Sequence, residues 1–188
     1  GSLVAIEPST GEILTLVSSP GIDVDQLANI GQHYKDISTD PYKPMFNRAV
    51  QASYPPGSVF KLVNGLIGLE EGVLHESNSY PCNGGYYYTS TRRLGCHAHS
   101  SPLKFKDAIA TSCNGYFCYV FKNILTNRKY ANIKEATAKW NEYVYSFGFG
   151  RQLGTDLYGE GTGYVPTPEY YDKGYNGRWN WGTVINCA

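Results

Sequence analysis

The chain has 188 residues, of which 41% are hydrophobic and 17% are charged, a balance typical of a folded globular protein rather than a disordered one. Its 16 basic and 16 acidic residues cancel, so the excess of positive charge that nucleic-acid phosphates attract is absent. Nucleic acid is therefore excluded as an expected partner. No apolar run of the sequence approaches the length that spans a membrane.

The first 20 residues predict a β-hairpin. Two short apolar runs, at residues 3–6 and 13–17, flank a turn that contains Pro8 and Gly11. Residues 19–45 follow with scattered glycines and prolines and weak periodicity, which predicts a long loop with one short helix near 24–30.

A helix is predicted over residues 59–71, where the rigid Pro55-Pro56-Gly57 approach ends and Gly72 supplies a C-terminal stop. Its apolar residues cover most of the circumference, which predicts a buried central helix. Gly65 and Gly68 lower helix propensity, so we expect a neighbouring element to pack closely against them.

Loops and helices alternate over the rest of the chain. Residues 77–102 predict a loop or irregular hairpin, and helical patterns follow near 103–111, 115–125 and 132–147. Glycine, proline and tyrosine dominate from residue 151 onward, which predicts a coil-rich tail over 151–188. We interpret residues 1–188 as one partial domain, with a hairpin at 1–20 and a helical subdomain at 46–150.

Ser58 and Lys61 are the first candidates for chemistry. Three residues apart on a helix, their side chains share one face. A serine hydroxyl needs a base to become a nucleophile, and burial lowers the pKa of a lysine so that it can serve as that base. Ser-x-x-Lys alone is weak, since it also occurs at Ser101-Pro-Leu-Lys104, where the serine is expected only to cap a helix.

Ser112-Cys113-Asn114 is the second candidate. A hydroxyl and an amide two residues apart on a turn can point into one cleft, where the hydroxyl relays a proton and the amide holds a substrate carbonyl. Alternatively, Ser112 or Asn114 is only the N-cap of the helix that follows.

Ser-x-x-Lys followed by Ser-x-Asn is the motif order of penicillin-binding proteins and serine β-lactamases. The wider context resembles the transpeptidase domain of class B penicillin-binding proteins, especially the cell-elongation type. That context consists of Val4-Ala-Ile-Glu-Pro-Ser-Thr-Gly-Glu-Ile, Asn47-Arg-Ala and Tyr54-Pro-Pro-Gly-Ser-Val-Phe-Lys61. The resemblance implies an α+β fragment of the serine transpeptidase/β-lactamase-like fold, with an N-terminal hairpin, a mostly helical subdomain and the C-terminal sheet strands missing.

The resemblance also implies roles. Ser58 is expected to be the acylated nucleophile, Lys61 its general base, Ser112 a proton relay and Asn114 a contact to the substrate amide. The expected substrates are peptidoglycan stem peptides, with β-lactam antibiotics as inhibitors that mimic the D-Ala–D-Ala bond. The parent protein is expected to be membrane-anchored, to act on the periplasmic face of the cytoplasmic membrane and to work with a membrane glycosyltransferase.

One departure from the family pattern is visible. The third family motif, Lys-Thr/Ser-Gly, does not occur in the 188 residues, and Lys173-Gly174 does not replace it. In the family the strand that carries this motif supplies half of the oxyanion hole, and losing one such donor costs about 10²–10³ in rate. We therefore interpret the chain as a truncated piece that acylates poorly by itself.

Cysteines and histidines gather within one stretch. Cys82, Cys96, His99 and Cys113 form a Cys₃His set of the kind that holds a structural zinc, and some elongation-type enzymes are similar in tying a metal to the Ser-x-Asn turn. The alternative is a Cys82–Cys96 disulfide. Catalysis itself is expected to need no cofactor.

Two other functions remain open. The first is a β-lactam sensor or a β-lactamase with the same acyl-serine chemistry. The second is a non-catalytic interaction module that is held together by a metal or disulfide, in which both motifs are helix caps.

Overall fold

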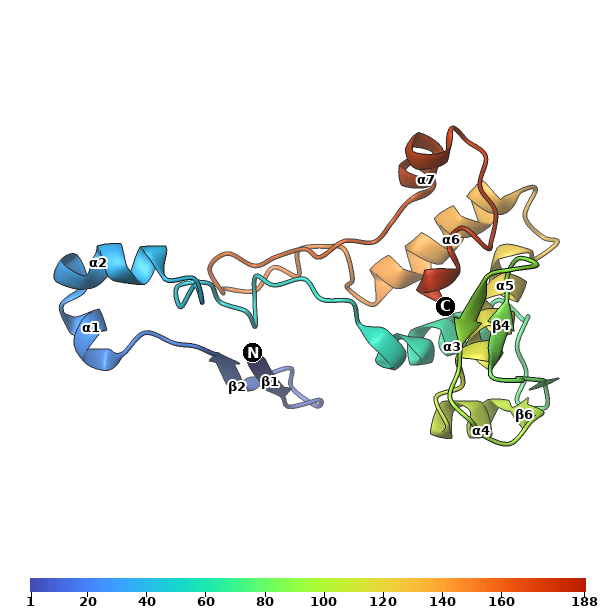
Figure 1. Cartoon of the computed structure of the whole chain (residues 1–188), viewed down its shortest axis with the longest axis horizontal. Helices are drawn as coiled ribbons and strands as arrows, with labels where there is room; N and C mark the ends of the chain where they lie inside the picture. The colour runs from blue at the N-terminus through green and yellow to red at the C-terminus, as the bar shows by residue number, and fades with distance from the viewer. The chain divides into compact units, whose positions relative to one another are not determined.

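The computed structural model describes residues 1–188, and the chain divides into two compact units (Figure 1). The first unit comprises residues 1–54 and 151–163, and the second comprises residues 55–150 and 164–188. The prediction of one domain, with a hairpin at 1–20, a helical subdomain at 46–150 and a tail at 151–188, is not tested by this division and stays a prediction.

The first unit begins with the predicted hairpin. Strand β1 (Ser2–Ile6) pairs antiparallel with β2 (Ile13–Ser18), and the register shifts between Ala5 and Ile6. Helix α1 (Val24–Ala28) follows and is capped by Asp23, whose carboxylate accepts a hydrogen bond from the Asp25 N–H. Helix α2 (Ile30–Thr39) was not predicted, because Gly31 and the polar residues after it hide its pattern.

Hydrogen bonds hold the irregular segments of the first unit to each other. The Ser18 hydroxyl accepts a hydrogen bond from the Arg48 N–H at 2.9 Å and donates one to the Phe46 carbonyl at 3.2 Å. The Gly161 N–H donates to the Val50 carbonyl at 2.9 Å, which joins residues 151–163 to the end of the first segment.

The second unit contains the remaining helices and strands. The 3-10 turn η1 (Gly57–Phe60) leads directly into α3 (Lys61–Glu70). Strand β3 (Ser79–Tyr80) pairs with β6 (Leu103–Lys104), and β4 (Gly85–Tyr87) pairs with β5 (Arg93–Gly95), both antiparallel. The later elements are α4 (Phe105–Ala110), α5 (Asn114–Leu125), α6 (Ile133–Ser146), α7 (Pro168–Tyr175) and the 3-10 turn η2 (Ile185–Cys187).

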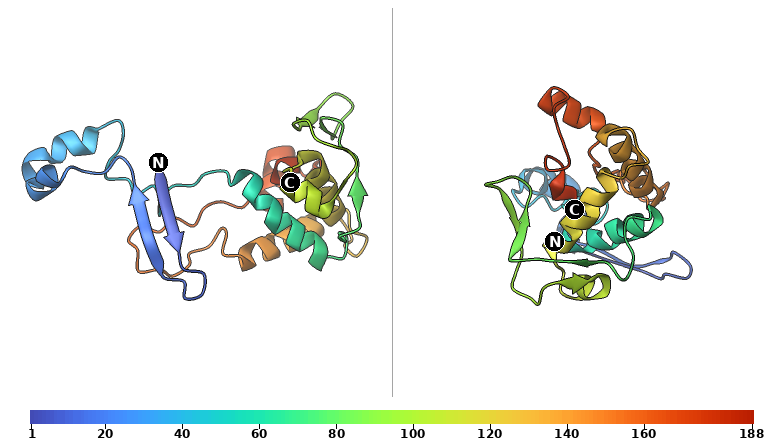
Figure 2. Two further views of the ribbon diagram at one scale, coloured as in Figure 1. Left: turned by 90° about the horizontal axis from the view of Figure 1, so that it is seen from below. Right: turned by 90° about the vertical axis from the view of Figure 1, so that its right-hand side faces the viewer.

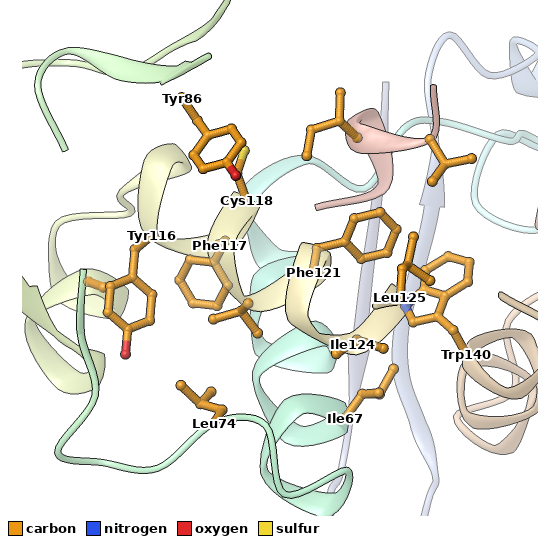
Figure 3. Close-up of a cluster of buried hydrophobic side chains, with 14 of the residues drawn as sticks. Ile67, Leu74, Tyr86, Tyr116, Phe117, Cys118, Phe121, Ile124, Leu125 and Trp140 are labelled. Carbon is orange, nitrogen blue, oxygen red and sulfur yellow. The ribbon is translucent and has the colours of Figure 1, made fainter. Parts of the chain in front are cut away.

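Helix α5 is the centre of the second unit. It packs against α3, α6, β4 and η2, and Figure 2 shows α3 and α5 near the C-terminal end of the chain. Its side chains Phe117, Phe121 and Ile124 are at most 1% exposed and lie in one buried cluster with Ile67 and Trp140 (Figure 3). Since η1, α3 and the start of α5 carry both predicted motifs, this core also fixes the site.

The prediction that α3 is buried on all sides is wrong. Leu62 and Leu66 are each 53% exposed, because α5 covers only one face of the helix. The predicted close packing at the glycines is confirmed. A Cβ atom at Gly65 would lie 3.0 Å from the Phe105 ring, and one at Gly68 would lie 3.0 Å from a Val120 methyl group.

Most other predicted elements are present. The pairs β3–β6 and β4–β5 form the irregular hairpin region, and α4, α5 and α6 fall where helices were predicted. Helix α7 was missed within the coil-rich tail, although Thr167 caps it and Pro168 is its first residue, a recognisable helix start. The predicted capping role of Ser101 is wrong, since its hydroxyl accepts from the Cys82 N–H at 2.9 Å.

The predicted α+β class is confirmed, with short antiparallel strand pairs beside several helices. No helix of the chain has both the length and the apolar character that crossing a bilayer requires.

Candidate active site

Ser58 and Lys61 lie where the chain enters α3. Gly57 has φ +63°, a left-handed conformation that favours glycine, and it turns the chain from Pro56 into η1. Ser58 is exposed, whereas Lys61 is only 6% exposed. The short 3-10 turn therefore presents a hydroxyl at the surface directly beside a buried amine.

The Ser112 turn connects α4 to α5. Ser112 has φ +51°, a conformation that is uncommon for a residue with a side chain, and its N–H bonds to the Ile109 carbonyl at 3.0 Å. The residue that caps α5 is Cys113, whose sulfur accepts from the Tyr116 N–H at 3.2 Å. The alternative in which Ser112 or Asn114 is the N-cap is therefore wrong, and both side chains are free for other contacts.

The four predicted catalytic and substrate-binding residues meet at the Lys61 amine. Lys61 Nζ lies 3.2 Å from Ser58 Oγ and 3.0 Å from Ser112 Oγ. It also lies 2.7 Å from the Ser112 carbonyl oxygen and 2.5 Å from Asn114 Oδ1. The second motif lies more than 50 residues from the first along the chain, so the fold, and not the local sequence, creates this arrangement.

Lys61 has no carboxylate partner among these contacts. Burial lowers the pKa of Lys61, and the charges of Cys96, Cys113 and Cys118 act in the opposite direction. An ammonium group donates only three hydrogen bonds, and here four neutral oxygens surround Nζ. The site can therefore hold Lys61 without a neutralising charge, which is what a lysine base requires.

Asn114 has a fixed orientation. Its side-chain N–H₂ donates to the Gly95 carbonyl at 2.8 Å, while its oxygen faces Lys61 Nζ. The end of β5 thus positions the amide of the Ser-x-Asn motif. The sequence analysis missed this contribution of Gly95, and no local pattern around residue 95 would have revealed it.

Phe117 also borders the site and was not predicted. Lys61 Nζ lies 5.8 Å from the centre of its ring, within the range of a cation–π contact. Its position three residues after Asn114 on a helix was the available signal, since that spacing places both side chains on one face.

The four predicted metal ligands converge beside the Ser112 turn. The donor atoms of Cys82, Cys96, His99 and Cys113 all lie within 4.8 Å of one another. All five cysteines are free thiols, so the alternative Cys82–Cys96 disulfide is not formed.

The donor set fits a tetrahedral zinc ion. Such a site needs four sulfur or nitrogen ligands about 2.0–2.3 Å from the metal. Two ligand atoms at that distance from one ion are less than 4.8 Å apart, which is the distance within which all four donor atoms lie here. His99 Nδ1 contacts the Ser100 carbonyl oxygen at 2.7 Å, which leaves Nε2 directed at the cluster, 3.4 Å from Cys96 Sγ. Cys113 is fully buried, so a metal held here would bind the Ser112 turn from its inner side.

The sulfurs of the cluster differ in their acidity. Burial raises the pKa of Cys96, but hydrogen bonds from His99 and from backbone N–H groups outweigh it and bring the pKa down to about 7. For Cys113 burial dominates and raises the pKa to about 12. Of these two sulfurs, Cys96 more readily binds a cation as a thiolate.

Comparison with known proteins identifies the family. Residues 1–178 match the model of the penicillin binding protein transpeptidase domain. The whole chain is 32% identical to the peptidoglycan D,D-transpeptidase MrdA of Acinetobacter baumannii and spans 27% of that protein. The chain belongs to the penicillin-binding protein transpeptidase domain family.

Solved structures agree with this assignment. PBP2 of Pseudomonas aeruginosa, in complex with WCK 5153, superposes with a TM-score of 0.78 at 26% identity, over 98% of this chain and 41% of that one. The penicillin G acyl-enzyme complex of penicillin-binding protein A from M. tuberculosis superposes with a TM-score of 0.62 at 27% identity, over 80% of this chain and 34% of that one. The resemblance to class B enzymes of the elongation type is therefore confirmed.

Proposed function

We propose that the protein is a D,D-transpeptidase that cross-links peptidoglycan stem peptides through an acyl-serine intermediate on Ser58. The chain spans only about a quarter of the curated relative MrdA, so this proposal concerns the whole protein to which the 188 residues belong. The observation that carries it is the convergence of Ser58, Ser112 and Asn114 on the buried amine of Lys61.

The proposed first step is acylation. Neutral Lys61 accepts the hydroxyl proton of Ser58 while Oγ bonds to the carbonyl carbon of the penultimate D-Ala. The C–N bond to the last D-Ala breaks, and its amine takes a proton through Ser112, which lies 3.0 Å from Lys61 Nζ. In the second step the amine of a neighbouring stem peptide attacks the ester and regenerates the Ser58 hydroxyl.

Asn114 is proposed to hold the substrate amide. Its side chain is already oriented by Gly95, so little ordering remains to be done when substrate binds. A substrate amide at this position would compete with Lys61 for the Asn114 oxygen, which lies 2.5 Å from Nζ in the structure.

The assignment of β-lactam binding is tested by covalent labelling. We expect a fluorescent penicillin to label the whole protein with one equivalent per chain, and the Ser58→Ala variant to remain unlabelled. An acyl-enzyme that persists for hours supports a transpeptidase or a sensor, whereas rapid turnover of the penicillin would favour the β-lactamase alternative. Labelling of the Ser58→Ala variant would contradict the proposed nucleophile.

The 188 residues by themselves are proposed to be a poor enzyme. They contain no Lys-Thr-Gly or Lys-Ser-Gly, the family motif whose strand supplies half of the oxyanion hole. We expect this chain alone to be labelled about 10²–10³ times more slowly than the whole protein, the usual cost of losing one oxyanion donor. Equal rates would contradict this part of the proposal.

A structural zinc is proposed at Cys82, Cys96, His99 and Cys113, because their donor atoms already share one small volume. The ion would supply a cross-link between these loops and the start of α5, with no part in the reaction. We expect one zinc per chain in protein purified without a nickel column, and three thiols that react only after chelation in denaturant. Reactive thiols and no bound zinc would contradict the site.

The place of action is proposed from the family alone. Peptidoglycan lies outside the cytoplasmic membrane, so we propose that the whole protein is anchored to that membrane with this domain on its periplasmic side. A membrane glycosyltransferase that polymerises the glycan is the proposed partner. We expect such an enzyme to co-purify with the whole protein from solubilised membranes. Absence of both proteins from the membrane fraction would contradict the proposed anchor and the proposed partner.

A further inference from the structure

A hollow apart from the Ser58 site lies between β4 and α5. It has a volume of about 450 Å³, which falls in the range of small-molecule sites. Aromatic rings and one cation dominate its lining, and no acidic residue contributes to it. The lining residues are Pro81, Asn83, Gly85, Tyr86, Tyr87, Tyr119 and Lys122. None of these residues belongs to the Ser58 site or to the proposed zinc ligands. We refer to this hollow as the tyrosine pocket.

The aromatic part of the tyrosine pocket is rigid before any ligand binds. Tyr119 stacks on Tyr80 with ring centres 4.9 Å apart and meets the edge of Tyr86 at 4.6 Å. The Tyr80 hydroxyl accepts from Asn123 at 2.9 Å, and Tyr86 packs edge-on against Trp181 at 5.8 Å. A ligand that rests on these rings therefore loses little free energy to their ordering.

The charge of the pocket is unbalanced. Lys122 Nζ lies over the Trp181 ring at 4.8 Å and has no carboxylate within salt-bridge distance. Outside the lining, the Arg93 guanidinium lies 5.8 Å from the centre of the exposed Tyr87 ring. A ligand with a carboxylate and a flat, partly apolar ring complements this arrangement of cations and aromatic faces.

The tyrosine pocket and the Ser58 site share two elements. Gly85, which lines the pocket, pairs with Gly95, and the Gly95 carbonyl orients Asn114. Along α5, Lys122 lies eight residues beyond Asn114, which is about 12 Å at 1.5 Å per residue. An extended peptide of about four residues is as long as this rise along the helix axis, which is short compared with a polymeric substrate.

From these observations we infer that the tyrosine pocket binds a carboxylate-bearing muropeptide segment of peptidoglycan, with a sugar ring on the tyrosines and a carboxylate at Lys122. This inference rests on the proposed function and adds a second subsite to it. Binding in the pocket raises the effective concentration of the scissile bond at Ser58 without touching the reacting atoms.

The test is calorimetric titration of the Ser58→Ala protein with a soluble GlcNAc–MurNAc-tripeptide. A tripeptide stem has no D-Ala–D-Ala bond, so its binding reports the pocket rather than the acylation site. We expect saturable binding that Lys122→Gln weakens about tenfold through loss of one charged hydrogen bond. Tyr87→Ala is expected to weaken it about threefold, and Lys122→Arg to restore it.

Lys106→Gln is the matched control, since Lys106 is an exposed lysine on α4 outside the pocket. It is expected to leave the affinity unchanged. Unchanged affinity in Lys122→Gln, with its thermal unfolding also unchanged, would overturn the inference, as would absence of saturable binding to the parent protein.

Two further ligands identify the carboxylate. In the muropeptide the lactyl carboxyl is amide-bonded to the stem, so the carboxylate at Lys122 belongs to the stem peptide. A GlcNAc–MurNAc disaccharide with its lactyl carboxyl capped as an amide is expected to bind more weakly than the muropeptide, and equal binding would overturn the contact with Lys122. A sugar-free tripeptide that binds as tightly as the muropeptide would overturn the stacking on the tyrosines.

Penicillin labelling separates the two proposals. In protein that retains Ser58, Lys122→Gln is expected to be labelled at the parent rate, because penicillin carries no glycan. If penicillin labelling is normal but muropeptide binding does not depend on Lys122, only the inference about the tyrosine pocket is contradicted. If no labelling depends on Ser58, the proposed function is contradicted.

Discussion

Helix α3 has a buried ionisable residue at each end, and the two residues have opposite kinds of partners. At its start, the Lys61 amine faces only neutral oxygens. After its end, the Glu71 carboxylate lies 2.7 Å from Lys129 and accepts hydrogen bonds from Asn127 and Tyr130. The comparison teaches that burial alone does not mark a catalytic group. A buried carboxylate with charged and hydrogen-bonding partners stays ionised, whereas a buried amine without a carboxylate partner favours its neutral form, which is the form that the proposed function needs.

The pKa shifts follow the same division. Burial lowers the pKa of Lys61 and so favours its neutral form. Burial raises the pKa of Glu71, but the hydrogen bonds from Lys129, Tyr143 and Tyr130 outweigh it and hold the pKa below its usual value. One end of α3 therefore favours a neutral base, and the other favours a permanent carboxylate.

The largest effect is expected at Lys61. Lys61→Met approximately preserves the length of the side chain and removes the proposed base, so we expect penicillin acylation of the whole protein to fall by at least about 10³-fold, within the range of a lost general base. Lys61→Arg is expected to fall as far, since a guanidinium does not give up its proton. Stopped-flow labelling measures both rates.

Lys106→Met is the control, an exposed lysine on α4 that is expected to leave the rate unchanged. Near-parental acylation by Lys61→Met, with the protein folded, would contradict the role of Lys61.

Glu71 is expected to affect stability and not acylation. Glu71→Ala should lower the free energy of unfolding by about 2–4 kcal/mol, because Tyr130 and Asn127 lose a buried partner. Urea unfolding measures this cost. Glu142→Ala is the matched control: its carboxylate also pairs with a lysine, but it is 66% exposed, and we expect a cost below about 1 kcal/mol.

Glu71 also predicts a pH dependence. Because its pKa is lower in the folded state than the ordinary 4.5, its contribution to stability is full above that value and is lost as the pH falls through the folded pKa. We expect the unfolding free energy of Glu71→Gln to fall less between pH 5 and pH 3, on the order of 1 kcal/mol less than for the parent. Identical acid sensitivity would show that Glu71 is not the group responsible.

Asn64 sharpens the comparison because it is buried, polar and uncharged. It lies one turn after Lys61, accepts from the Trp140 indole N–H at 2.9 Å and donates to the Cys187 carbonyl at 2.6 Å. We expect Asn64→Ala to cost about 1–3 kcal/mol in urea unfolding through two unsatisfied groups. Acylation should change little when the folded fraction is taken into account, and a larger loss would place Asn64 among the groups that position Lys61.

The sequence predicted the site better than its surroundings. Ser58, Lys61, Ser112 and Asn114 were chosen from two short motifs, and the structure brings their side chains together at one amine. Their catalytic roles stay a prediction. The four proposed zinc ligands also meet, as their spacing and the family resemblance indicated.

What the sequence did not reveal depends on distant partners. Glu71 with Tyr130 and Asn64 with Trp140 are 59 and 76 residues apart, so no local period encodes them. The exposed face of α3 was missed for a related reason. Apolar residues on every side of a helix predict burial, but α5 covers one face only, and what covers Leu62 and Leu66 is not set by α3 itself.

The most direct test of the account is a site-resolved titration of Lys61. In whole protein with ¹³C-labelled lysines, the Lys61 Cε signal, assigned by its loss in Lys61→Met, should titrate with a pKa below the ordinary 10.5, because burial without a carboxylate disfavours the ammonium. A Lys61 pKa at or above 10.5 would contradict the claim that this amine is prepared to take the proton of Ser58.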